Sequence, residues 1–260
     1  MNPTHPTHIA HITRFSENQW HAVQDGREIG RGDTSTRPDG RLFLSIDAWS
    51  APVFDQIASA MVADLPAPLH ALVDAGDPDA TSGWQRAGFT IGRREREYLI
   101  PTDPAVTGLH RAQPPSDITI VPLAQAQHGP LRALDREIRA QVRAAVGWQR
   151  MPAEVIPLPP GVTVPDPAAY AVAARADRYV GLLRLAPVPR QPRIGLIAVR
   201  AEDHRRGIAR ALLASVLDHL HHSGTAAARA EVDETNAAAV ALFEGISAQQ
   251  TGSTLELVHR

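Results

Sequence analysis

A short apolar run that leads through a basic, glycine-containing segment into a helical pattern is the feature that most restricts the fold of this chain. Residues 193–210 read RIGLIAVRAEDHRRGIAR, and the apolar positions within 194–199 predict a strand. From Gly207 onward, apolar residues recur four positions apart and predict a helix over 207–222. The first N–H groups of a helix have no intrahelical partners, so a strand that enters a helix through a glycine is a device for binding phosphate groups.

Three arginines surround the start of this predicted helix. Arg205 and Arg206 crowd its first turn, and Arg210 lies one turn further along. Cations at a helix N-terminus oppose the helix dipole and are mildly destabilising. A multiply charged anion bound among these arginines would offset that cost, so we predict a pyrophosphate-binding site here.

The composition narrows the class of protein. The chain has 260 residues, 43% of them hydrophobic, which suffices for one large domain or two modest ones. The formal net charge of −2 provides no basic field for nucleic acid, and no apolar run has the length of a membrane span or the character of a secretion signal. The absence of cysteine excludes disulfides, thiolate metal sites and a cysteine nucleophile. We expect a cytoplasmic protein with no metal, no nucleic-acid partner and no membrane partner.

The two halves of the chain carry similar patterns, which predicts an internal duplication. An offset of 159 residues carries Asp77 to Asn236, whereas an offset of 152 carries residues 41–44 to 193–196. The two offsets differ because the first half has no counterpart of residues 204–210, so it lacks the glycine and arginine segment. We therefore predict three segments, namely a degenerate domain over 1–110, a linker over 111–117 and an intact domain over 118–260.

Apolar periodicity gives the second half an alternating order of strands and helices. We predict strands over 118–123, 170–174, 179–185, 194–199, 227–232 and 254–258, and helices over 130–146, 207–222 and 237–244. Asn236 is a good N-cap for the last of these helices. The first half is predicted to repeat the order strand, strand, strand, helix, strand, helix, strand.

This arrangement resembles the GNAT superfamily of acyl-CoA-dependent N-acyltransferases. The pyrophosphate motif of that family has Gln or Arg, two residues, Gly, one residue, and then Gly or Ala. Residues 204–209 read HRRGIA and depart from the motif only in the first position, which is His204. The family's later signature is matched by the pairs Glu231-Val232 and Leu242-Phe243, with Asn236 between them.

The resemblance covers residues 118–258 and, in a degenerate form, the first half. It implies a mixed α/β (α+β) fold of two GNAT-like domains, each with a central, mixed but mostly antiparallel twisted sheet flanked by helices. Tandem copies with only the second intact are an arrangement that this superfamily uses.

The resemblance also implies acetyl-CoA as co-substrate, bound between the predicted strands 194–199 and 227–232. The pantetheine arm would pair with the strand backbone, and the pyrophosphate would lie on the segment that follows it. The implied cofactor-binding residues are Ile197, Ala198, Val199, His204, Arg205, Arg206, Gly207, Ile208, Ala209, Arg210, Asn236 and Phe243.

Acetyl transfer to an amine requires a base, because alkyl amines have a pKa of about 10 and react only when neutral. The strand over 194–199 has no carboxylate, so we predict Glu231 on the next strand as the catalytic base. Its position resembles that of the base in the ribosomal-protein N-terminal acetyltransferases. A glutamate that simply faces solvent is the alternative interpretation.

Phe243 stands where family members usually place the tyrosine that protonates the leaving thiolate. Water, Tyr179 or Tyr170 could replace it, or the site could be inactive. The leading prediction is direct transfer, through a ternary complex, to a primary amine of a small molecule, an antibiotic or a protein N-terminus. The alternatives are a non-catalytic acetyl-CoA-binding pseudoenzyme or assembly module, and a general phosphate or nucleotide binder.

Two further expectations concern the acceptor and the assembly. Trp148 and the proline-rich residues 151–167 stand where the superfamily places its acceptor-binding loop. The tandem arrangement predicts either a monomer that forms an intramolecular pseudo-dimer or a homodimer.

Overall fold

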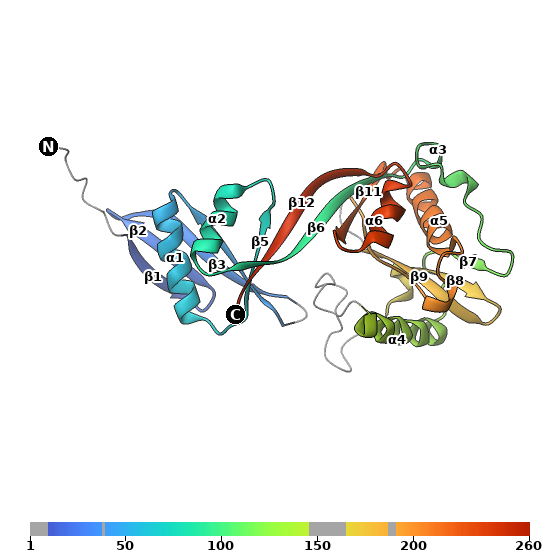
Figure 1. Ribbon diagram of the computed structural model, residues 1–260, viewed down its shortest axis with the longest axis horizontal. Coiled ribbons are helices and arrows are strands. Elements are labelled where there is room, and N and C mark those ends of the chain that lie inside the picture. The colour runs from blue at the N-terminus through green and yellow to red at the C-terminus, as the bar shows by residue number, and fades with distance from the viewer. Residues whose placement is uncertain (1–9, 38–39, 146–164, 187–190) are drawn as a thin grey trace. The chain divides into compact units, whose positions relative to one another are not determined.

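The computed structural model describes residues 10–37, 40–145, 165–186 and 191–260 (Figure 1). The chain divides into two compact units. Unit 1 consists of Met1–Arg94 together with Ser253–Arg260, and unit 2 consists of Glu95–Gly252.

Unit 1 is a sheet whose strands lie in the order β1-β2-β3-β4-β5-β12-β6. Strands β4 and β5 run parallel, whereas the pairs β1–β2, β2–β3, β3–β4 and β5–β12 run antiparallel. The apolar side of helix α1 buries Val53, Ile57 and Met61 against sheet residues such as Trp20 and Leu69. The elements in chain order are β1 (His11–Ser16), β2 (Gln19–Gln24), β3 (Arg27–Thr36), β4 (Leu42–Ala48), α1 (Ala51–Asp64), β5 (Leu69–Asp74), α2 (Pro78–Arg86) and β6 (Thr90–Pro101).

Unit 2 is a sheet with helices on both faces, in the strand order β12-β6-β11-β10-β9-β8-β7. Helices α5 and α4 cover opposite faces of this sheet (Figure 1). Because side chains alternate along a strand, Ala171 and Ala173 of β8 belong to the core cluster that includes α5, whereas Tyr170 and Val172 belong to the cluster that includes α4. The remaining elements of the chain are α3 (Pro104–Thr107), η1 (Leu109–Arg111), β7 (Thr119–Val121), α4 (His128–Ala145), η4 (Pro167–Ala169), β8 (Tyr170–Arg175), β9 (Arg178–Ala186), β10 (Arg193–Val199), η5 (Ala201–Asp203), α5 (Ile208–His222), β11 (Ala227–Asp233), α6 (Ala237–Glu244) and β12 (Gln249–His259).

The compact units divide the chain differently from the predicted segments 1–110, 111–117 and 118–260. The end of β12 lies antiparallel to β5, with Thr254 opposite Asp74, and so contributes to unit 1. The end of β6 lies antiparallel to β11, with Glu97 opposite Glu231, and so contributes to unit 2. Apolar periodicity marks a strand but does not identify its neighbour, which is why these pairings do not follow from the pattern.

The predicted fold class is confirmed as a mixed α/β structure with mostly antiparallel strands flanked by helices. The order β4-α1-β5-α2-β6 in the first half matches the order β10-α5-β11-α6-β12 in the second. This agreement fits the predicted duplication, although the degenerate first copy stays a prediction. Among the residues that the structure describes, no helix combines the length and the apolar character needed to cross a membrane.

Candidate functional site

Strands β10 and β11 pair in parallel over a short stretch and then separate. Arg193 lies opposite Arg229, and Ile194 lies opposite Ala230. A register irregularity between Ile194 and Leu196 in the β9–β10 pair marks the point of separation. Beyond this point the backbone groups on the facing edges of β10 and β11 do not bond to each other, so they are available to a ligand.

A cavity of about 780 Å³ opens between the separated strand ends, and we call it the β10–β11 cavity. Its walls come from β10, β11, the first turn of α5, helix α6 and helix α4. Twelve of the thirteen sequence-predicted site residues line it, namely Ile197, Ala198, Val199, His204, Arg205, Gly207, Ile208, Ala209, Arg210, Glu231, Asn236 and Phe243. Arg206 is the predicted residue that does not.

The connection between β10 and α5 presents the start of the helix to the cavity. Gly207 is the N-cap of α5 in the left-handed conformation, with φ 82°, and Gly207, Ile208 and Ala209 all line the cavity. Arg205 is also left-handed, with φ 57°, which costs a non-glycine residue roughly 1–2 kcal/mol. Strain of this kind persists where the surrounding structure enforces it.

Arg206 is held by a ring of alternating charges instead of facing the cavity. Its guanidinium lies 2.7 Å from Asp117 Oδ1 and 3.0 Å from Asp203 Oδ1. Arg175 closes the ring, because it contacts Asp203 and lies 2.9 Å from Asp117 Oδ2. The hydrogen bond from Arg206 lowers the pKa of Asp117, and the same bond raises the pKa of Arg206. Asp203 is buried, so this ring anchors the connection from within.

A second group of ion pairs fixes the other side of the connection. The buried Arg200 contacts Glu137 of α4 and lies 3.4 Å from Glu202 Oε1. In addition, the N–H of Ala201 donates a hydrogen bond of 3.1 Å to Gln141 Oε1 of α4. Within the loop, the imidazole Nε2 of His204 lies 2.8 Å from the carbonyl oxygen of Val199, at the end of β10. The path of the connection is therefore set by charges on its own residues and their partners.

Glu231 lies on the cavity wall, where its carboxylate accepts a hydrogen bond from Arg193. Its neighbours Ala230 and Val232 are buried in the core under α5 and α6, so Glu231 points to the opposite face of the sheet. Its side chain is 30% exposed, which leaves part of the carboxylate open. Sequence reasoning missed Arg193, although its place at the start of the neighbouring strand was a signal for such a pair.

The described walls of the cavity contain no tyrosine. Phe243 is buried and stacks on Tyr98, with ring centroids 5.6 Å apart. The two tyrosines considered as proton donors lie in the core cluster under α4 instead. There the Tyr179 hydroxyl accepts a hydrogen bond of 2.9 Å from the N–H of Gln127, and burial raises the pKa of Tyr170.

Of the expected acceptor loop, Trp148 and residues 151–164 lie outside the described residues, whereas residues 165–167 lead into η4. Helix α4 forms part of the described wall of the cavity, to which it contributes Ile138, Gln141, Val142 and Ala144. The sequence pattern identified Ile138 and Val142 as an apolar helix face, but gave no sign that this face borders a cavity.

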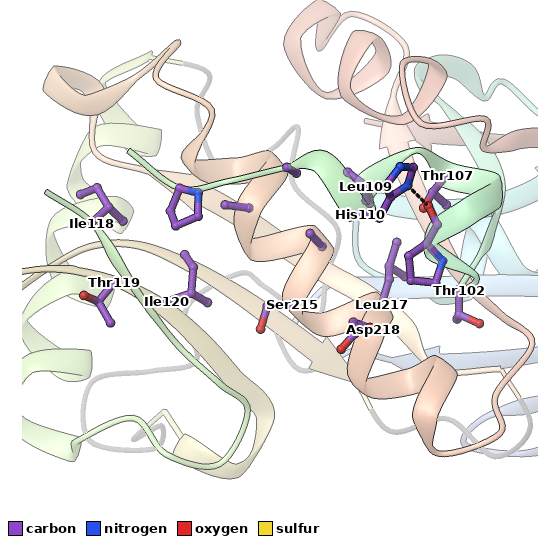
Figure 2. Close-up of a pocket in the computed structure, with 15 residues that line it drawn as sticks. Thr102, Thr107, Leu109, His110, Ile118, Thr119, Ile120, Ser215, Leu217 and Asp218 are labelled. Carbon is purple, nitrogen blue, oxygen red and sulfur yellow. Dashed lines mark hydrogen bonds between the residues drawn. The ribbon is translucent and has the colours of Figure 1, made fainter. Parts of the chain in front are cut away.

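A second cavity, of about 500 Å³, lies between α5 and residues 102–120 (Figure 2). Figure 2 shows Ser215 and Asp218 of α5 on one side, with Ile118 and His110 among the residues opposite. The His110 Nδ1 atom lies 3.1 Å from the carbonyl oxygen of Pro104. The described walls of this cavity include none of the predicted site residues, which converge on the β10–β11 cavity.

Residues 138–246 match the model of the acetyltransferase (GNAT) family. This segment is a GNAT domain. The match includes β10, α5, β11 and α6, and therefore most of the described wall of the β10–β11 cavity. No curated protein sequence matches the chain significantly.

Solved structures share the GNAT fold over most of this chain. A GCN5-related N-acetyltransferase from Sphaerobacter thermophilus is 16% identical with a TM-score of 0.65, over 95% of this chain and 82% of that one. A tandem GNAT protein from the clavulanic acid biosynthesis pathway is 11% identical with a TM-score of 0.61, over 93% and 82%. A GCN5-related N-acetyltransferase from Kribbella flavida is 13% identical with a TM-score of 0.56, over 96% and 89%. At these identities the likeness establishes the fold of acetyltransferases.

Proposed function

We propose that the GNAT domain is an acetyl-CoA-dependent N-acetyltransferase that transfers acetyl directly to a primary amine. The observation that carries this proposal is the separation of β10 from β11 immediately before the open N-terminus of α5. One unpaired strand edge and one helix N-terminus then border the same cavity. Acetyl-CoA offers complementary groups, because its pantetheine arm carries amides and its pyrophosphate is anionic.

The connection before α5 fits a pyrophosphate. The N–H groups of the first turn and the helix dipole favour an anion there, and Arg205 and Arg210 add positive charge at the cavity. Arg210 also donates a hydrogen bond of 3.2 Å to the carbonyl oxygen of Gly245, which orients its guanidinium. The edge of β10 at Ile197 and Ala198 is the proposed partner of the pantetheine amides.

Glu231 is the proposed base, acting directly or through one water. It would accept the proton of the acceptor ammonium, so that the neutral nitrogen attacks the thioester carbonyl. The C–N bond forms, the nitrogen releases its second proton to water, the C–S bond breaks, and the sulfur leaves as a thiolate. A thiol has a pKa of about 8.5, so this thiolate is a fair leaving group near neutral pH. The thiolate then takes its proton from water.

A binding module without catalysis is the second candidate. Phe243 favours it, because a phenyl ring on the cavity wall has no proton to donate. Calorimetry with acetyl-CoA, followed by a free-thiol assay across an amine library, separates the candidates. Binding with amine-dependent thiol release supports the transferase, and binding without turnover supports the module. Absence of binding contradicts both, and equal competition by ATP indicates a general nucleotide binder.

A further inference from the structure

His204 stands at the first position of the pyrophosphate motif, where the GNAT family has Gln or Arg. Both of those side chains carry N–H donors at every pH, whereas a neutral imidazole has one N–H and one acceptor nitrogen. Histidine is also the side chain whose charge ordinarily changes between pH 5 and pH 8. This difference from the family therefore bears on the pH dependence of the proposed acetyl-CoA site.

The structure indicates which nitrogen of His204 carries the proton when the ring is neutral. Nε2 lies 2.8 Å from the carbonyl oxygen of Val199, and a carbonyl oxygen only accepts hydrogen bonds, so Nε2–H is the donor. Nδ1 of the neutral ring is then an acceptor without a proton. Within the described parts of the chain, the bond to Val199 is the one hydrogen bond of this ring. His204 is exposed and lines the β10–β11 cavity, so a ligand in the cavity can reach it.

The other charged groups on the described wall of this cavity keep their charges over that pH range. They are Asp203, Arg205, Arg210, Glu231 and Asp233, whereas α4 and α6 contribute no charged side chain to this wall. Guanidiniums and ordinary carboxylates hold one charge between pH 5.5 and pH 8. Just outside the wall, the buried Arg200 contacts Glu137 and Glu202. Among the described side chains of the wall, His204 is therefore the one whose type ordinarily titrates near neutral pH.

A pyrophosphate is anionic, and its oxygens accept hydrogen bonds. Neutral His204 offers such a ligand an acceptor nitrogen, because its one N–H is already bonded to Val199. The protonated ring keeps that bond and gains an Nδ1–H donor and a positive charge next to Arg205, and a hydrogen bond from a charged donor to an anion is among the strongest. We infer that acetyl-CoA binds with His204 protonated, so that the protein takes up a proton from solvent as the coenzyme binds near neutral pH. This inference rests on the proposed function and extends it to the charge state of the coenzyme site.

Calorimetry counts this proton. The binding enthalpy of acetyl-CoA at pH 7, measured in PIPES and in imidazole buffer, gives the number of protons taken up, because the two buffers differ in their heats of ionisation. The phosphate monoester of the coenzyme also titrates near about pH 6, but it contributes equally in each variant. The unmodified full chain is expected to take up more protons per coenzyme than His204→Gln, by roughly 0.3 to 1. Its Kd is also expected to rise more steeply between pH 5.5 and pH 8, by roughly three- to tenfold.

Two further variants separate the charge of His204 from a general effect of substitution. His204→Arg carries a permanent charge, so it is expected to take up no more protons than His204→Gln and to bind acetyl-CoA more tightly than the unmodified protein at pH 8. His222→Gln is the matched control at the other end of α5, where His222 is exposed, and it is expected to keep the full uptake. Thermal melting verifies that each variant is folded.

Equal proton uptake in the unmodified protein and in His204→Gln would overturn the inference, as would an equal loss of uptake in His204→Gln and His222→Gln. Either result leaves the transferase proposal intact, because acetyl-CoA still binds. Absence of acetyl-CoA binding to the unmodified protein would contradict both proposals.

Discussion

Arg193, the first residue of β10, donates a hydrogen bond to the carboxylate of Glu231 on β11. Arg193 lies in the stretch where the two strands still pair, and Glu231 directly follows Ala230, the last residue of β11 that pairs with β10. The Arg193 side chain is 16% exposed, so its position is constrained by packing. The proposed base is thus fixed to the strand whose edge is proposed to receive the cofactor.

Glu231→Gln is expected to lower kcat by at least about 100-fold, because the amide cannot accept the ammonium proton. The Kd for acetyl-CoA is expected to stay within about twofold, since the fold of the loop is unaffected. Steady-state kinetics and calorimetry on the same preparation measure both quantities. Turnover equal to that of the unmodified protein would remove Glu231 from the mechanism.

Arg193→Met is expected to lower kcat by roughly 10- to 100-fold, because a misplaced catalytic group loses the geometry of the reaction. Acetyl-CoA affinity is expected to change little. Arg193→Lys retains a charge that can reach the same carboxylate, and partial recovery of kcat is expected. If the methionine and lysine variants have identical kcat and KM, the role of Arg193 is structural only.

Arg205 and Arg206 are adjacent in sequence but are expected to behave differently. Arg205→Gln should weaken acetyl-CoA binding by roughly tenfold, the effect of losing about 1.4 kcal/mol, with little change in Tm. Arg206→Gln should lower Tm, because the buried Asp203 loses one of its partners. The pair is measured by calorimetry and thermal melting. The reverse assignment, with Arg206 affecting affinity alone, would contradict the geometry of the ring.

Gly207→Ala and Gly224→Ala form a matched pair at the two ends of α5. Both glycines are left-handed, with φ 82° and 80°, and an added Cβ would meet nothing within 4 Å at either position. Each substitution is therefore expected to lower the free energy of unfolding by a similar amount, about 1 kcal/mol. Only Gly207→Ala is expected to weaken acetyl-CoA binding. Equal affinities in the two variants would argue against a ligand at the start of α5.

Unit 1 contains a buried carboxylate whose ionisation should make stability depend on pH. Burial alone would raise the pKa of Glu256, but the hydrogen bond with His70 and the charges of Arg93 and Arg41 outweigh it, so the pKa is lowered. Arg41 Nη1 and His70 Nδ1 lie 2.7 Å and 3.0 Å from Glu256 Oε1, and Arg93 Nη2 lies 3.0 Å from Oε2.

Because the pKa of Glu256 is lowered in the folded state, the stabilisation by its ionised carboxylate is complete above the unfolded pKa of about 4.3. It is lost as the pH falls through the folded pKa. Thermal melting between pH 7 and pH 3 is expected to show a drop in Tm at the acid end. In Glu256→Gln, Tm should be lower at pH 7, and that acid-dependent drop should be smaller. The same pH dependence in both proteins would show that Glu256 does not contribute to it.

The sequence was sufficient for the elements of the GNAT domain and for the position of its loop. The four-residue spacing of apolar residues predicted α5, and the N-cap preference of asparagine predicted α6, where Asn236 Oδ1 accepts a hydrogen bond of 3.1 Å from the N–H of Ala239. These are local effects, and local effects are visible in a single sequence.

Features that depend on distant residues could not be read from the pattern. Arg206 belongs to a ring that includes Asp117, 89 positions away, so its direction depends on the folded chain. Strands β6 and β12 each have one end in unit 1 and the other in unit 2. This division depends on strand pairing, which apolar periodicity does not encode. Tyr170 and Tyr179 have the right chemistry for a proton donor, but strand alternation turns them into the core under α4.

The connection between β4 and α1 consists of residues 49–50, whereas residues 200–207 join β10 to α5. The first half thus lacks the loop that is proposed to bind the cofactor, so the chain should have one acetyl-CoA site. Calorimetric titration of the full chain with acetyl-CoA tests this most directly. The account predicts one molecule bound per chain, with affinity reduced in Gly207→Ala and preserved in Gly224→Ala. A stoichiometry of two, or affinity that is indifferent to Gly207, would contradict it.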